Sequence, residues 1–176
     1  MSRDRQWCLF KRQAPDSFKF DLVHKEKDAH TRIIWGCSWA HDDSFFVTVS
    51  REKHDSVKLW TGVNQTSASP GQYVAKVPDS KAPSATAVSF FPSKIDGNYA
   101  FVVGLESGAI QAWLTNTDPA AAWTLMFSFP DYWAHAQAVR RIKFNVTKAD
   151  SREEKYTIAT CSNDHSVRVF EIIKQK

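Results

Sequence analysis

The sequence contains no long hydrophobic run and no apolar leader. None of its apolar stretches approaches the ~20 residues that a membrane-spanning helix requires. The N-terminal stretch is rich in charged residues and lacks the apolar core that defines a secretory signal peptide. No segment shows the periodicity of an amphipathic helix. We therefore expect no membrane segment, no secretion signal and a protein without helices.

Cysteine is also scarce. The chain has three cysteines, which lie far apart in sequence, and each stands within an apolar strand pattern. This spacing argues against a disulfide framework or a metal-binding set. We interpret Cys8, Cys37 and Cys161 as small buried residues in a reducing compartment.

Motifs of catalysis and cofactor binding are missing. We find no nucleophile elbow, no glycine-rich phosphate loop and no Cys/His set with metal-ligand spacing. His41, Asp42 and Asp43 could suggest a metal, but they lie where a hairpin turn belongs. The sequence therefore predicts no enzyme activity, no cofactor, no bound metal and no small-molecule substrate.

What the chain has is enough apolar surface for a core and a small excess of positive charge. It is 43% apolar and 13% aromatic, so a folded core is expected. The formal charge of +4 is compatible with nucleic-acid binding but does not require it.

A short pattern recurs four times: a small residue, an acid, a turn, and a strand that ends in an aromatic residue. The copies are Ser2–Phe10, Ser50–Trp60, Gly104–Trp113 and Ser162–Phe170. Their closing aromatics are 50, 53 and 57 residues apart. Repetition on this scale is typical of β-propeller blades, and the repeats resemble WD repeats.

The strand pattern predicts an all-β fold, a partial WD-repeat β-propeller of about three to three and a half blades, each blade a four-stranded antiparallel sheet. We expect one unit over 1–176 that is a fragment of a seven-bladed ring. The predicted blades cover 1–23, 30–77, 84–127 and 135–173, where the first has only its two outer strands and the last lacks its outer strand. Ile34, Cys37 and Trp39 should mark a buried face, and the spacing from Ile34 to Cys37 suggests a β-bulge.

In WD repeats a histidine, a hydroxyl, an acid and a tryptophan form a buried hydrogen-bond relay. Resemblance to them suggests His30, Thr48, Asp55 or Glu52, and Trp60 in the second blade. The same resemblance suggests His135, Thr160 and Asp164 in the last blade, with Phe170 in place of the tryptophan. The middle blade has Lys81 and Glu106 at the histidine and acid positions, so we expect it to be the weakest. Although His, hydroxyl and carboxylate are the elements of a catalytic triad, their recurrence once per repeat favours a structural role.

One stretch is more specific. His30–Trp39 (HTRIIWGCSW), followed by Ser50–Lys53 (SREK) and Val57–Trp60 (VKLW), is similar to the second propeller of the Elongator complex protein 2 family, and so is Ser2–Trp7 (SRDRQW). The chain departs from that family at Glu52, where an aspartate is typical, and at His54-Asp55, which resembles an insertion in the turn. The insertion could move the relay acid to Asp55.

The resemblance implies a non-catalytic scaffold of the Elongator complex, which modifies wobble uridines of transfer RNA. Its expected partners are the largest scaffold subunit, the catalytic subunit and, through a basic face, transfer RNA. The implied location is the cytoplasm, with the nucleus as an addition. The alternatives are a WD-repeat scaffold of an unrelated complex and an RNA-binding propeller.

Arginines cluster around the predicted turns. In a propeller, these turns and the loop before each first strand open onto the same face, so we expect a basic patch that contacts a protein partner or RNA. Trp35, at an outward-pointing position, is either an anchor for a partner or packed against the adjacent blade. The candidate contact residues are Arg3, Arg32, Arg51, Arg140, Arg141 and Trp35.

Overall fold

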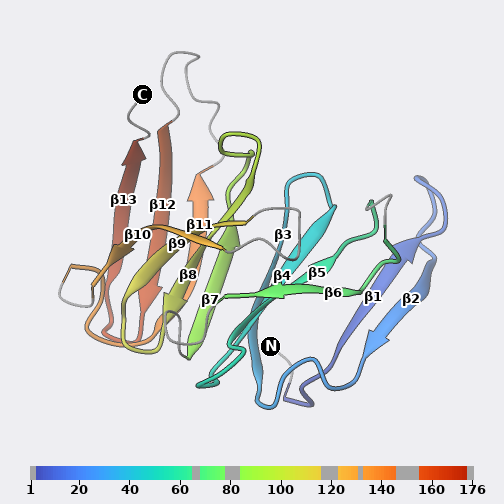
Figure 1. Cartoon of the computed structure of the whole chain (residues 1–176), viewed down its shortest axis with the longest axis horizontal. Coiled ribbons are helices and arrows are strands. Elements are labelled where there is room, and N and C mark those ends of the chain that lie inside the picture. The colour runs from blue at the N-terminus through green and yellow to red at the C-terminus, as the bar shows by residue number, and fades with distance from the viewer. Residues whose placement is uncertain are drawn as a thin grey trace.

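The computed structural model describes residues 3–64, 68–77, 84–115, 123–130, 133–145 and 155–173. Its thirteen strands form four antiparallel sheets that stand side by side (Figure 1). The sheets are β1-β2, β3-β4-β5-β6, β7-β8-β9-β10 and β11-β12-β13. In the part of the chain that the structure describes there is no helix, and hence none that could cross a membrane.

The strands follow one another along the chain, and each pairs with its neighbour in sequence. Their bounds are β1 Trp7–Arg12, β2 Phe20–Glu26, β3 Ile34–Trp39, β4 Phe45–Ser50, β5 Val57–Thr61, β6 Tyr73–Lys76, β7 Ala85–Phe90, β8 Tyr99–Leu105, β9 Ile110–Thr115, β10 Thr124–Phe129, β11 Val139–Asn145, β12 Lys155–Ser162 and β13 Val167–Ile173. β2 and β10 extend slightly beyond the predicted ends of their blades at 23 and 127.

The first strand of each of the last three sheets carries a bulge. The register of β3 against β4 shifts between Ile34 and Gly36, which confirms the bulge that the sequence indicated there. Equivalent shifts occur between Ala85 and Ala87 in β7 and between Val139 and Arg141 in β11. A bulge bends its strand and increases the local twist, and here the bulged strands contact one another across the sheets, β3 with β7 and β7 with β11.

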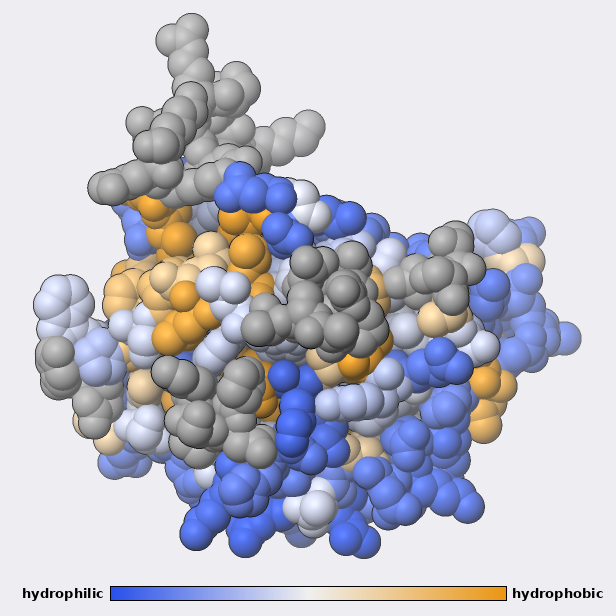
Figure 2. Space-filling model, viewed as in Figure 1, coloured by the Kyte–Doolittle hydropathy of each residue, from blue (hydrophilic) through white to orange (hydrophobic). Residues whose placement is uncertain are grey.

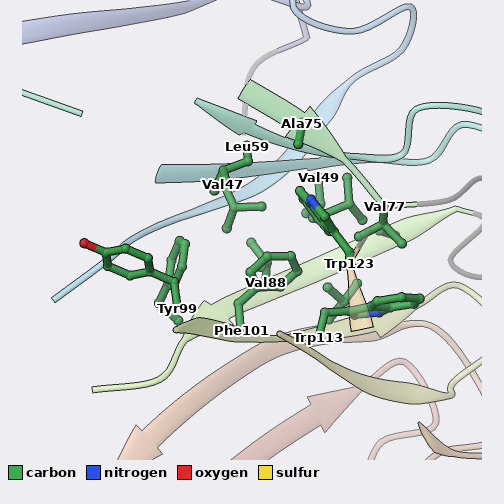
Figure 3. Close-up of a cluster of buried hydrophobic side chains, with 14 of the residues drawn as sticks. Val47, Val49, Leu59, Ala75, Val77, Val88, Tyr99, Phe101, Trp113 and Trp123 are labelled. Atoms are coloured by element: carbon green, nitrogen blue, oxygen red, sulfur yellow. The ribbon is translucent and has the colours of Figure 1, made fainter. Parts of the chain in front are cut away.

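The largest core lies between the second and third sheets. Val47 and Val49 of β4 face Val88 and Phe101 of the next sheet, and Trp113 and Trp123 lie beside them (Figure 3). Every residue of β4 and of β8 is buried, because both are central strands covered on both faces. Burying each of these large apolar side chains contributes about 1.5–3 kcal/mol.

The side of the second sheet that faces β1 and β2 is more open than the sequence indicated. Ile34 is buried, but Cys37 is exposed and the side chain of Trp39 is 41% exposed, so the prediction that all three share a buried face was wrong. The physical reason is that β1 and β2 alone stand against this side, and they leave part of β3 uncovered. Cys8 is likewise exposed and Cys161 half-buried, so the prediction of buried cysteines was wrong too.

The last sheet has an open face of its own. Val167 and Val169 of β13 are exposed at alternate positions, as expected for one face of a strand with nothing packed on it. Figure 2 shows hydrophobic surface gathered on the side of the molecule where Figure 1 places β10–β13, whereas the lower part of the same view is mostly hydrophilic.

Candidate interaction site on the turn face

The second blade contains a buried hydrogen-bond relay. His30 stands before β3, Thr48 lies in β4 and Trp60 lies in β5. The Nε2 atom of His30 is 2.8 Å from Oγ1 of Thr48, and the indole Nε1–H of Trp60 donates to the same oxygen at 2.8 Å. All three side chains are buried, so these polar groups find partners only within the relay or the turn beside it.

The acid of this relay is Glu52, and the assignment to Asp55 is corrected. Oε1 of Glu52 lies 2.8 Å from Nδ1 of His30. The same carboxylate accepts the backbone N–H of Thr31 at 3.1 Å and its hydroxyl at 2.7 Å. Asp55 pairs with Lys76 instead.

The turn's backbone explains the correction. Asp55 has a φ of 58° and lies two residues before β5, and Arg5, Gly108 and His165 occupy the equivalent positions before β1, β9 and β13, all with positive φ. The residue with positive φ therefore keeps a fixed distance from the strand that follows the turn. The relay acid instead keeps its place relative to the strand that precedes the turn. The two additional residues of this turn fall between these points and leave Glu52 in place.

The chemistry of the relay fixes its proton positions. A carboxylate can only accept, so Nδ1–H of His30 donates to Glu52; in a neutral ring Nε2 then accepts from the hydroxyl of Thr48. This arrangement requires a neutral imidazole. Burial lowers the pKa of His30 to about 4, although the charge of Glu52 opposes that change.

The last blade has a shorter version of the relay. Nδ1 of His135 lies 3.0 Å from Oδ2 of Asp164, and Nε2 lies 2.8 Å from Oγ1 of Thr160. The Thr160 hydroxyl is 3.3 Å from the backbone carbonyl of Arg168, and no indole reaches it, since Phe170 stands at the tryptophan position. Hydrogen bonds, first from Ser166 and then from the backbone of Ala136, hold the pKa of Asp164 well below its usual range.

The middle blade is built differently. Lys81, the residue at its histidine position, lies outside the described residues. Glu106 is exposed enough to form an ion pair with Arg51 of the second blade. The indole of Trp113 donates to Oε1 of Gln111 at 3.2 Å. The lower stability of this blade stays a prediction, and its β8 strand is fully buried.

Four arginines line one cavity of about 450 Å³ between the first sheet and the second. Arg3 and Arg5 come from the turn before β1, Arg32 from the loop before β3, and Arg51 from the turn after β4. The remaining lining residues are Thr31, Ile33 and Trp35. The sequence pointed to Arg3, Arg32 and Arg51, and it missed Arg5, although Arg5 occupies the recurrent turn position.

Trp35 contributes an aromatic side chain to the lining of this cavity. It is half-buried, and the guanidinium carbons of Arg51 and Arg140 lie 5.5 Å and 4.6 Å from the centre of its ring. Both distances are within the range of a cation–π interaction. Arg140 comes from β11 of the last sheet, so this cluster joins distant parts of the chain. Arg141 is exposed and does not line the cavity.

Among the residues that the structure describes, no group of three His, Cys, Asp or Glu side chains could hold a metal ion. His41-Asp42-Asp43 lies in the turn before β4, where Asp42 accepts a hydrogen bond from the Tyr99 hydroxyl at 2.6 Å. The histidine–acid groups of the two relays are enclosed in their turns. The arginine-lined cavity, in contrast, carries exposed charged side chains that a partner can reach.

Comparison with models of protein families finds no match. Comparison with curated proteins finds Elongator complex protein 2 of several species. The chain is 36% identical to the protein of Drosophila melanogaster over 98% of its length and 35% identical to that of Dictyostelium discoideum over 98%. It is 29% identical to that of Saccharomyces cerevisiae over 97%. These matches cover 21%, 20% and 20% of the relatives, so the chain spans about a fifth of their length.

The fold also has a counterpart among solved structures. Sqt1 of Saccharomyces cerevisiae superposes with a TM-score of 0.66 at 15% sequence identity, over 96% of this chain and 40% of that chain. At this identity the likeness concerns the fold alone. Together with the four open antiparallel sheets, it confirms an all-β partial propeller of the WD-repeat type. The resemblance to Elongator complex protein 2, indicated first by the HTRIIWGCSW and SRDRQW segments, is confirmed over nearly the whole chain.

Proposed function

From its kinship with a fifth of Elongator complex protein 2, we propose that this chain is a non-catalytic scaffold module of the Elongator complex. In this role it holds the largest scaffold subunit and the catalytic subunit together and so supports the modification of wobble uridines in transfer RNA. The observation that carries the proposal is the match of 98% of the chain to relatives with that name.

The structure supports a scaffold rather than an enzyme. The two histidine–hydroxyl–acid groups that could suggest catalysis are buried within turns, and their geometry repeats from blade to blade. Repetition at equivalent positions is expected of groups that hold a fold together. A catalytic group would need to reach a substrate, whereas the side chains of His30 and His135 are inaccessible.

Affinity purification of the tagged protein from its own cells tests the proposal. Partners are quantified by mass spectrometry against an untagged control. We expect the other Elongator subunits, above all the catalytic and the largest subunits, to be enriched together. Recovery of a folded protein with none of these subunits would contradict the proposal and favour a scaffold of an unrelated complex. Recovery chiefly of RNA would favour the RNA-binding alternative.

A further inference from the structure

Three of the four arginines that line the cavity between the first and second sheets form no ion pair with a described residue. Within the described residues, Arg51 has an ion-pair partner in Glu106, while Arg3, Arg5 and Arg32 have none. Asp4 lies between two of them in sequence, but its carboxylate accepts the backbone N–H of Gln6 at 3.3 Å and forms no ion pair with either. Three neighbouring guanidinium groups thus lie exposed at one hollow, and none of them forms an ion pair with a residue that the structure describes.

The surroundings of these arginines are held in place. Thr31, in the lining, donates its hydroxyl to Glu52 at 2.7 Å, so this part of the cavity is tied to the buried relay. On the other side, Trp35 lies close to the guanidinium groups of both Arg51 and Arg140. A site whose walls are fixed before binding loses less conformational entropy when a ligand arrives.

The charge balance narrows the class of ligand. A carboxylate or a phosphodiester supplies about one negative charge, whereas a phosphomonoester supplies about 1.5–2 charges and three acceptor oxygens at neutral pH. Clusters of arginine are the usual receptors for such groups, because each guanidinium can form two parallel hydrogen bonds with phosphate oxygens. Three unpaired guanidinium groups therefore suit a phosphomonoester better than the other two.

The size and the apolar part of the lining indicate what carries the phosphate. A cavity of about 450 Å³ is larger than one phosphate group requires, and Ile33 and Trp35 add apolar surface to it. A side chain next to a phosphorylated residue in a peptide would cover that surface. An RNA strand would instead need basic residues spaced along a groove. Beyond the lining, Arg140 adds one guanidinium group beside Trp35, and Arg141 is not among the lining residues.

We propose that the cavity lined by Arg3, Arg5, Arg32 and Arg51 binds a phosphoserine or phosphothreonine segment of a partner protein. Such a site would make one contact of the scaffold dependent on phosphorylation of the partner. The proposal deepens the scaffold function and rests on it, because it presumes that this face meets other proteins.

The test is a binding measurement on the purified full chain at physiological ionic strength. The probes are fluorescent peptide pools in which random positions flank a fixed phosphoserine, serine or glutamate, together with a short poly-uridine oligonucleotide. The test variants are Arg3→Ala/Arg32→Ala, which removes two of the unpaired charges, and Arg32→Lys, which keeps the charge but loses the planar fork. Arg141→Ala is the matched control, since it removes an exposed arginine outside the cavity. Thermal unfolding verifies that each variant is folded.

We expect the phosphoserine pool to bind at least about tenfold more tightly than the serine and glutamate pools, a difference of about 1.4 kcal/mol. The double variant should lose this preference, Arg32→Lys should weaken it and Arg141→Ala should keep it. Equal binding of the three pools, tighter binding of poly-uridine, no binding, or an unchanged preference in the double variant would each overturn the proposal. Purification of both the unmodified protein and the double variant from cells separates the two proposals. If the unmodified protein recovers no Elongator subunit, the scaffold function itself is contradicted.

Discussion

The relay of the second blade should contribute more to stability than the relay of the last blade. The substitution Thr48→Val tests this, because it removes the hydroxyl that the second-blade relay shares. Valine has nearly the shape of threonine but neither donates nor accepts. The change would leave two buried groups without a partner, the indole N–H of Trp60 and Nε2 of His30. Each orphaned group costs about 1–3 kcal/mol, so the free energy of unfolding should fall by about 2–6 kcal/mol.

Thr160→Val is the matched control. In the last blade the hydroxyl serves one buried ring nitrogen, on His135, and no indole. The expected loss is therefore about 1–3 kcal/mol, roughly half of that for Thr48→Val. Urea unfolding, followed by tryptophan fluorescence, would measure the free energy of unfolding of both variants.

A double-mutant cycle provides the stricter test. Trp60→Phe should cost less stability in the Thr48→Val background than in the unchanged protein, because the acceptor of the indole N–H is already gone. The coupling should be about 0.5–3 kcal/mol, as for other groups in direct contact. Additive losses, or a Thr160→Val variant as unstable as Thr48→Val, would refute the idea that a shared hydroxyl unites the relay.

Three further predictions concern the same turns. The unfolded chain takes up a proton at His30 near its ordinary pKa of 6.5, whereas the folded protein does so only near 4. The contribution of His30 to the free energy of unfolding is therefore complete above pH 6.5, and about 3 kcal/mol of it is lost towards pH 4. A gain in stability on acidification, measured by unfolding at constant ionic strength, would contradict this. Glu52→Gln should cost at least about 1–3 kcal/mol because it weakens a buried, charge-assisted contact, while Asp55→Asn, at a half-exposed ion pair, should cost about 1 kcal/mol or less; equal urea midpoints would restore Asp55 as the relay acid. Gly108→Ala should destabilise by more than about 2 kcal/mol, because the new Cβ would lie 1.9 Å from the backbone oxygen of His135 at a φ of +98°, and an unchanged melting temperature would show that this turn can move.

The strand order and the bulges could be read from the sequence because they depend on local patterns. Alternation and short turns determine where a strand begins and ends, and the three-residue step from Ile34 to Cys37 already indicated a bulge. The family resemblance could be read for a similar reason, since HTRIIWGCSW is a continuous segment.

Burial at the open side of the second sheet could not be read in the same way. The alternation of Ile34, Cys37 and Trp39 says which side chains share a face but not whether another sheet covers that face. In the structure two strands stand there, and Cys37 and Trp39 remain exposed.

The identity of the relay acid could not be predicted from the sequence either. The sequence offered Glu52 and Asp55, three positions apart in one turn, and either could have faced His30. The choice depends on the path of the backbone, which turns through a positive φ at Asp55 and places Glu52 against the ring.

By itself, the sequence determined the repeat, the strands, the propeller class and the kinship, because each is written in local spacing or in continuous motifs. Only the tertiary structure decided which charges meet. Arg3, Arg32 and Arg51 come from separate turns, and Arg140 reaches Trp35 from another sheet. Their grouping depends on how the sheets are packed against one another, a relation between distant segments that local pattern does not encode.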